Sequence, residues 1–352
     1  MAGKTNAGNF FEDFRIGQEI GHATPRTLTE GDVALYTGLY GTRFALNASE
    51  TFAQALGLPG APIDDMLVFH TVFGKTVPDI SLNAVANLGY AGGVFGQPVY
   101  PGDTLSARSR VIGLKQNSNG KTGVVYVRSV GENQRGETVL DYVRWVMVRK
   151  RDAEAAVAET LVPDLPGAVA PESFELPPFR GLEAYRADLA GSTDYWEDYA
   201  KGERIDHVDG MTIEESEHMI ATRLYQNTAK VHFNQFEQAG GRFGRRLIYG
   251  GHIISLARSL SFNGLANAFK IVAINGGSHT NPSFAGDTIY AWSEVLDSFE
   301  VPGHGAVGAL RLRTLACKDQ PCDGFPDKGT GGTYPESVVL DFDYTVLMPK
   351  RP

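Results

Sequence analysis

A histidine and a pair of glycines are the residues of this chain whose types and spacing best suit a chemical reaction. His232 ends the segment LYQNTAKVH, and Gly250, followed by Gly251, comes eighteen residues later. An imidazole with a pKa near ~6.5 takes up and returns a proton at neutral pH. The glycines open a stretch with one apolar helical stripe, so their backbone N–H groups would stabilise an oxygen that develops negative charge.

A second copy of this segment lacks the histidine. The sequence LYGTRFALN, near the beginning of the chain, ends in Asn47 where the later copy ends in His232. A shift of 185 residues gives ten identities over residues 12–40, and a shift of 184 aligns Gly102 with Gly286. This self-similarity predicts two homologous halves. The proton carrier is present in the second half alone.

Each half repeats one order of predicted elements: a helix, the LY segment, a long apolar helix and three strands. The strand candidates alternate apolar and polar residues, which is typical of antiparallel strands with one wet face. A long helix with a curled antiparallel sheet, present twice, predicts an α+β fold. The expected helices are 29–38, 65–76, 213–224 and 250–262. The expected strands are 103–114, 122–130 and 138–150, followed by 287–297, 306–316 and 337–348.

A proline-rich segment separates the halves. Residues 151–180 contain five prolines, which neither continue a helix nor donate to a central strand. We therefore expect a first half at 1–150, a surface linker at 151–183 and a second half at 184–352.

Composition narrows the class of protein. The chain has 352 residues and a net charge of −9, which argues against nucleic acid or an anionic membrane surface as a partner. It has no run of eighteen apolar residues, and its first residues do not resemble a signal peptide. Cys317 and Cys322 have no second pair with which to form a zinc site, so no metal is expected. A reduced pair in the cytoplasm is expected, with a local disulfide as the alternative.

Across nearly its full length the chain resembles the MaoC-like dehydratase family, whose hydratase motif reads Gly-Asp-x-Asn-Pro-Leu-His, with a helix-opening glycine eighteen residues after the histidine. His232 and Gly250 match that pattern, whereas Asn227 stands at the position of the catalytic aspartate and Lys230 at that of the proline. The resemblance implies a double hotdog fold, in which each half wraps a sheet around one central helix. The first-half counterparts are Thr42, Asn47 and Asp65, so the resemblance implies one active site, built around the second half.

The resemblance also implies a reaction. It indicates a cofactor-free hydro-lyase that reversibly hydrates a short, branched, dicarboxylic enoyl-CoA, with mesaconyl-CoA and β-methylmalyl-CoA as the expected pair. Coenzyme A enters as part of the substrate, and a homo-oligomer is expected. Three alternatives stay open: an (R)-specific enoyl-CoA hydratase for plain acyl chains, a non-catalytic acyl-thioester-binding protein, and a thioesterase.

Roles for individual residues follow from this resemblance and from charge. His232 would act as general base and acid, Asn227 would position the water, and Gly250 with Gly251 would stabilise the thioester oxygen. The predicted substrate contacts are Tyr225, Lys230 and Arg246. Arg246 belongs to the cluster RFGRRL, for which an exposed, solvated set of charges is the alternative. The remaining histidines are interpreted as ordinary polar residues: His22, His70, His207, His218, His252, His279 and His304.

Overall fold

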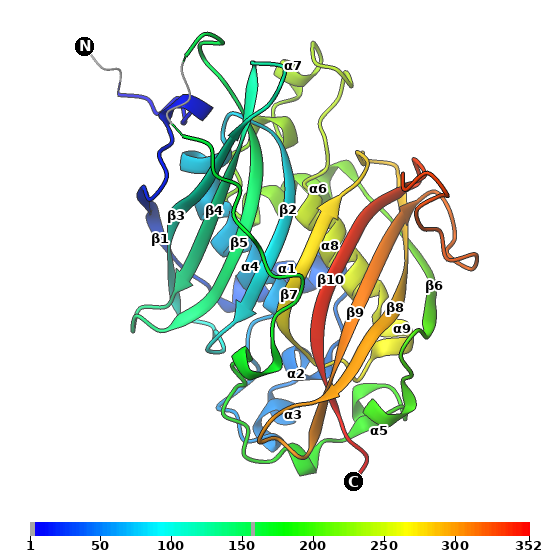
Figure 1. The fold of residues 1–352 in the computed structure, drawn as a ribbon. Helices are drawn as coiled ribbons and strands as arrows, with labels where there is room; N and C mark the ends of the chain where they lie inside the picture. Colours follow the sequence, from blue (N-terminus) through cyan, green and yellow to red (C-terminus); the bar gives the residue numbers. More distant parts are fainter. Residues whose placement is uncertain (1–3, 156–158) are drawn as a thin grey trace.

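One ten-stranded antiparallel sheet forms the centre of the computed structural model, which describes residues 4–155 and 159–352. Figure 1 shows the strands side by side across the molecule, with the long helices on one face. The strand order is β1-β3-β4-β5-β2-β7-β10-β9-β8-β6. The first five strands in this order come from the first half of the chain and the last five from the second. The halves therefore meet where β2 pairs with β7.

The strands of the two halves have matching lengths and order. They are β1 (Glu19–Thr27), β2 (Ala84–Phe95), β3 (Thr104–Gln116), β4 (Thr122–Glu132), β5 (Thr138–Arg149), β6 (Arg204–Thr212), β7 (Lys270–His279), β8 (Thr288–Glu300), β9 (Val307–Lys318) and β10 (Val338–Pro349). The helices are α1 (Glu30–Tyr40), α2 (Ala45–Ala48), α3 (Glu50–Ala55), α4 (Asp65–Thr76), α5 (Ala187–Ala190), α6 (Glu215–Leu224), α7 (Gln235–Gln238), α8 (Gly250–Leu260) and α9 (Phe262–Leu265).

Two enclosed helices, α4 and α8, occupy the core. Every residue of α4 is buried, and so is every residue of α8 after Gly250. Both helices are mostly apolar, and some of their buried polar side chains bond to each other inside the core, as His70 and Ser255 do. Each packs against the strands of its own half, which confirms the predicted α+β, double hotdog architecture. The predicted starts of both helices, at Asp65 and Gly250, are also confirmed.

The three predicted strands of each half are present, and the described residues of each half form two further strands. The sheet-edge strands β1 and β6 are short and mostly exposed, so they lack an apolar alternation. The central strands β2 and β7 are rich in glycine, which weakens a strand signal. Glycine is required there because the halves approach closely: a Cβ on Gly93 would lie 2.9 Å from the Cβ of Ile274. The stretch GYAGGVFG is therefore part of this seam between the halves.

Two equivalent histidines fix the edge strands. His22 on β1 and His207 on β6 each lie 2.8 Å through Nε2 from a serine hydroxyl of the neighbouring strand, Ser109 and Ser293 respectively. These equivalent contacts indicate a shared structural role for the pair.

The proline-rich segment crosses the face of the sheet away from α4 and α8 (Figure 1). The backbone N–H of Val169 donates to Asn275 Oδ1 on β7 at 2.9 Å, and Arg311 on β9 donates to the Gly167 carbonyl at 2.8 Å. Because one sheet runs through both halves, the boundaries 1–150, 151–183 and 184–352 stay a prediction.

Cys317 and Cys322 are buried and are not bonded to each other. None of the helices in the described part of the chain has the length and apolar character needed to cross a membrane.

Candidate active site

His232 lies on a short 3₁₀ turn (Lys230–His232) and is held by the backbone. Its Nδ1 lies 3.0 Å from the carbonyl oxygen of Leu247, which accepts only, so Nδ1 carries the ring proton of the neutral imidazole. Nε2 has no recorded partner in the described chain and is not fully enclosed, so its lone pair is available. Burial lowers the pKa of His232 to about 4, despite the opposing effect of the Leu247 hydrogen bond. The ring is therefore neutral at pH 7 and suited to accept a proton.

The start of α8 has free backbone donors. Tyr249, the residue before the helix, supplies no side-chain cap, and within the described residues the amides of Gly250 and Gly251 have no recorded acceptor. A Cβ on Gly251 would lie 2.5 Å from Cε1 of His70, so a larger residue does not fit there. The ring of Tyr249 packs edge-on against His232 with centroids 5.6 Å apart, which links the helix start to the histidine. The structure thus brings His232 and the glycine pair together.

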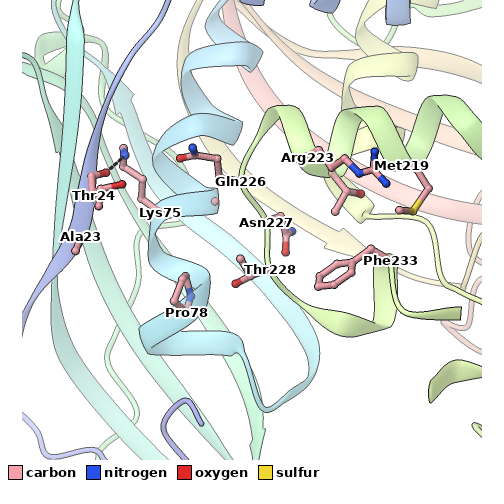
Figure 2. A pocket seen from close by; sticks show the side chains of 12 residues that line it. Ala23, Thr24, Lys75, Pro78, Met219, Arg223, Gln226, Asn227, Thr228 and Phe233 are labelled. Carbon is pink, nitrogen blue, oxygen red and sulfur yellow. Dashed lines mark hydrogen bonds between the residues drawn. The ribbon is translucent and has the colours of Figure 1, made fainter. Parts of the chain in front are cut away.

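Asn227 lines a cavity of about 620 Å³ that opens between the two halves (Figure 2). Its Oδ1 accepts from the Ala229 amide at 3.0 Å, while its side-chain nitrogen has no recorded partner in the described chain. Phe233, the residue after His232, also lines the cavity, whereas the ring of His232 is directed to Leu247. The cavity therefore reaches the predicted motif from its Asn227 side.

Basic side chains line the cavity from both halves. Lys75, at the end of α4, is buried and donates to the carbonyl of Thr24, as Figure 2 shows. Burial lowers the pKa of Lys75 to about 8, with the nearby charge of Arg26 as a smaller cause. Arg223 lines the same cavity. Both side chains favour an anionic occupant.

The predicted contacts Arg246 and Lys230 are both paired with acids. Arg246 donates to Glu215 and, through Nη1, to the carbonyl of Phe233 at 3.5 Å. Nζ of Lys230 lies 3.4 Å from Glu237. Arg246 is thus next to the His232 turn, and Lys230 stays on the surface; their roles in substrate binding stay predictions.

Tyr225 lies in the core and not on the cavity wall. Its hydroxyl donates to that of Tyr40 at 2.7 Å, and Tyr40 in turn lies 2.8 Å from Nδ1 of His252. Nearby, His70 lies 2.9 Å through Nε2 from the hydroxyl of Ser255. This buried polar network connects the helices of both halves behind the site, and substrate contact by Tyr225 stays a prediction.

Three histidines that the sequence interpretation set aside surround the site. His218 and His252 are each 1% exposed, and a charge on His218 would lower the pKa of both His252 and His232. His279 packs directly against Gly250. The repeat contained a signal for them, because their first-half counterparts are apolar: Val33, Leu67 and Phe95.

Across residues 4–155 and 159–352, no group of three or more His, Cys, Asp or Glu side chains is arranged to hold a metal ion.

Comparisons with known proteins identify the family of this chain. The family model described as "Mesaconyl-CoA hydratase" matches residues 2–325. A protein of Chloroflexus aurantiacus named beta-methylmalyl-CoA dehydratase is 68% identical over 351 residues, covering 100% of both chains. The chain belongs to the mesaconyl-CoA hydratase family.

Solved structures of similar proteins superpose on this chain and support its fold. A putative MaoC domain dehydratase from Chloroflexus aurantiacus superposes with a TM-score of 0.98 at 68% identity, with 100% of both chains covered. A Mycobacterium tuberculosis protein described as having a double hotdog fold superposes with a TM-score of 0.77 at 25% identity, covering 97% of this chain and 98% of its own. The resemblance to MaoC-like dehydratases is therefore confirmed.

Proposed function

We propose that this protein reversibly adds water to the double bond of mesaconyl-CoA and so forms β-methylmalyl-CoA. The observation that carries the proposal is the tautomer of His232: its Nδ1 proton is used by Leu247, which leaves Nε2 as a base beside the free amides of Gly250 and Gly251. The family model and the relative from Chloroflexus aurantiacus bear names that correspond to the two directions of this reaction.

Each group has a defined task in the proposed hydration. His232 Nε2 takes a proton from water as the water oxygen bonds to the β-carbon of the acyl group. Negative charge then develops on the thioester oxygen, where the amides of Gly250 and Gly251 donate to it, aided by the α8 dipole. Protonated His232 returns its proton to the α-carbon, and the reverse sequence removes water. The side-chain amide of Asn227 holds the water from the cavity side.

The second carboxylate of the substrate has a place in this scheme. Asn227 supplies no negative charge, and burial holds the pKa of His232 at about 4 in the free protein. An anion near the ring would favour its protonated form and raise that pKa. A dicarboxylic acyl group thus makes His232 a better base than a plain acyl chain would. The reaction as proposed uses no cofactor apart from the CoA portion of the substrate.

One assay separates this proposal from its alternatives. The pure protein is mixed with mesaconyl-CoA or crotonyl-CoA, and the enoyl-thioester absorbance and free thiol are followed together. Loss of absorbance without thiol, faster with mesaconyl-CoA, is the expected result. Preference for crotonyl-CoA would indicate a hydratase of plain acyl chains, thiol release a thioesterase, and binding without reaction a passive thioester-binding protein.

The proposal extends to location and assembly. We place the enzyme in the cytoplasm, which two unbonded cysteines support because thiols stay reduced there. We also propose a homo-oligomer, which light scattering on the purified protein tests.

A further inference from the structure

His279 is the last residue of β7, and its ring lies against the first residue of α8. A Cβ built on Gly250 would lie 2.4 Å from Cε1 and 2.6 Å from Nδ1 of His279. Such separations are shorter than atoms tolerate, so no side chain larger than glycine fits at residue 250 while His279 stays in place. The glycine that begins α8 therefore also makes room for an imidazole beside the free amides.

The hydrogen bonds of His279 indicate which nitrogen carries its proton. The hydroxyl of Tyr90 lies 3.2 Å from Nε2, its one recorded partner in the described part of the chain. Burial raises the pKa of Tyr90, so this hydroxyl stays neutral and is able to donate to Nε2. With the hydroxyl as donor, the ring proton resides on Nδ1. That nitrogen is enclosed and has no partner within the described residues.

The ring is neutral under ordinary conditions. Burial lowers the pKa of His279 to about 4, with the charge of His232 as a smaller cause. The two imidazoles are thus close enough to affect each other's protonation. A neutral imidazole with a buried, unused N–H is a hydrogen-bond donor without an acceptor, which is unfavourable unless a ligand provides one.

The first half has a different residue at the position that matches His279. A shift of 184 residues places Phe95 at the position of His279. The ammonium of Lys270 lies 5.4 Å from the centre of the Phe95 ring and pairs with Asp65, the first residue of α4. An apolar ring and an ion pair fill the first-half position. The imidazole occurs only beside the helix start that keeps its glycine and its catalytic histidine.

We propose that His279 is a further catalytic residue, which donates a hydrogen bond from Nδ1 to the thioester oxygen as negative charge develops on it. With the amides of Gly250 and Gly251 it forms a three-donor site for that oxygen. His279 transfers no proton, so His232 remains the base and acid of the reaction. This inference rests on the proposed function and adds a residue to the same site.

The test compares two substitutions at residue 279. His279→Phe introduces the first-half residue, keeps the ring shape and removes the donor; we expect kcat to fall about 10²- to 10³-fold, with KM changed only a few-fold. His279→Gln keeps an N–H donor, so its kcat should be at least about tenfold higher than that of His279→Phe. The loss should be the same factor for mesaconyl-CoA and crotonyl-CoA, because both carry the thioester. His304→Phe, on an exposed loop, is the control.

Other outcomes would overturn the inference. Normal turnover of His279→Phe would do so, and so would a loss confined to mesaconyl-CoA, which would place His279 at the free carboxylate. Equal losses in the Phe and Gln variants, or weakened binding of butyryl-CoA in both, would assign a packing role. If the wild-type protein hydrates neither thioester, the proposed function itself fails; if it does and His279→Phe matches it, only this inference fails.

Discussion

The two central helices begin in opposite ways although they occupy equivalent positions. At α4 the side chain of Asp64 caps the helix by accepting from the Met66 amide at 2.9 Å, and Asp65 pairs with Lys270 and accepts from the Ile271 amide at 3.0 Å. At α8 a glycine pair leaves the amides free. An acid at a helix start satisfies the helix dipole and would repel an anionic oxygen. The first helix start thus satisfies its own amides, whereas the second has donors for the thioester oxygen in the reaction that we propose.

This comparison separates residues that maintain the fold from residues that we propose perform chemistry. His22 and His207 occur in both halves and hold equivalent serines, so they maintain the fold. His232 and His279 occur in the second half alone, opposite Asn47 and Phe95. Substitutions that make one half resemble the other test the distinction directly.

The largest effect is expected when His232, the proposed general base, is replaced by asparagine, the residue at the matching first-half position. His232→Asn removes proton transfer, so kcat for mesaconyl-CoA should fall about 10²- to 10⁴-fold, as measured from the enoyl-thioester absorbance. The reciprocal change Asn47→His should leave the rate unchanged, because Asp65 occupies the helix start on that side. A rate within twofold of wild type for His232→Asn would remove His232 from the mechanism.

A loss of stability is expected when the ion pair between Asp65 of the first half and Lys270 of the second half is broken. Asp65→Asn leaves the buried ammonium of Lys270 without its carboxylate, so the free energy of unfolding should fall by about 3–5 kcal/mol in urea titration. Replacing both residues, as Asp65→Asn with Lys270→Met, should restore most of that loss. Full stability of the single variant would show that the pair does not hold the two halves together.

The two equivalent histidines, His22 and His207, should make the free energy of unfolding depend on pH to different extents. Burial lowers the pKa of His207 to about 4 against an unfolded value near ~6.5, so the unfolded chain binds more protons and stability is lost as the pH falls between these values. The expected contribution is about 2 kcal/mol between pH 7 and pH 5. His22 has Asp79 at Nδ1, which opposes its shift, so it should contribute less. Unfolding titrations of His207→Gln and His22→Gln at pH 7 and pH 5 measure how much each substitution reduces the pH dependence of the free energy of unfolding. An equal reduction in the two variants would contradict the prediction.

The smallest effect is expected at Asn227. Asn227→Asp adds a negative charge beside the cavity, which should slow mesaconyl-CoA about tenfold through repulsion of its free carboxylate and leave crotonyl-CoA equal or faster. The ratio of kcat/KM for the two thioesters is the measurement, and Asn227→Ala serves as the uncharged control. An unchanged ratio would limit Asn227 to a structural role.

The sequence predicted the parts of this molecule that depend on local pattern. An apolar stripe identified α8, the repeated order of elements identified α4, and the self-comparison identified Asn47 and His232 as counterparts. The edge strands β1 and β6 were missed because their exposed, polar residues do not alternate. His279 was set aside because its surroundings come from distant positions: Tyr90 is 189 residues away in the other half. Proximity of that kind is produced by the pairing of β2 with β7, which no short pattern encodes.

The β2–β7 seam has a consequence for how such a chain can change over evolutionary time. In an assembly of two identical subunits, every substitution appears on both sides of the interface. A single chain with the seam inside it removes that constraint, so one copy is free to acquire an aspartate at its helix start while the other keeps its glycine. Asp65 and Gly250 record this freedom at one pair of matched positions. Divergence of the first half therefore allows the second half to specialise.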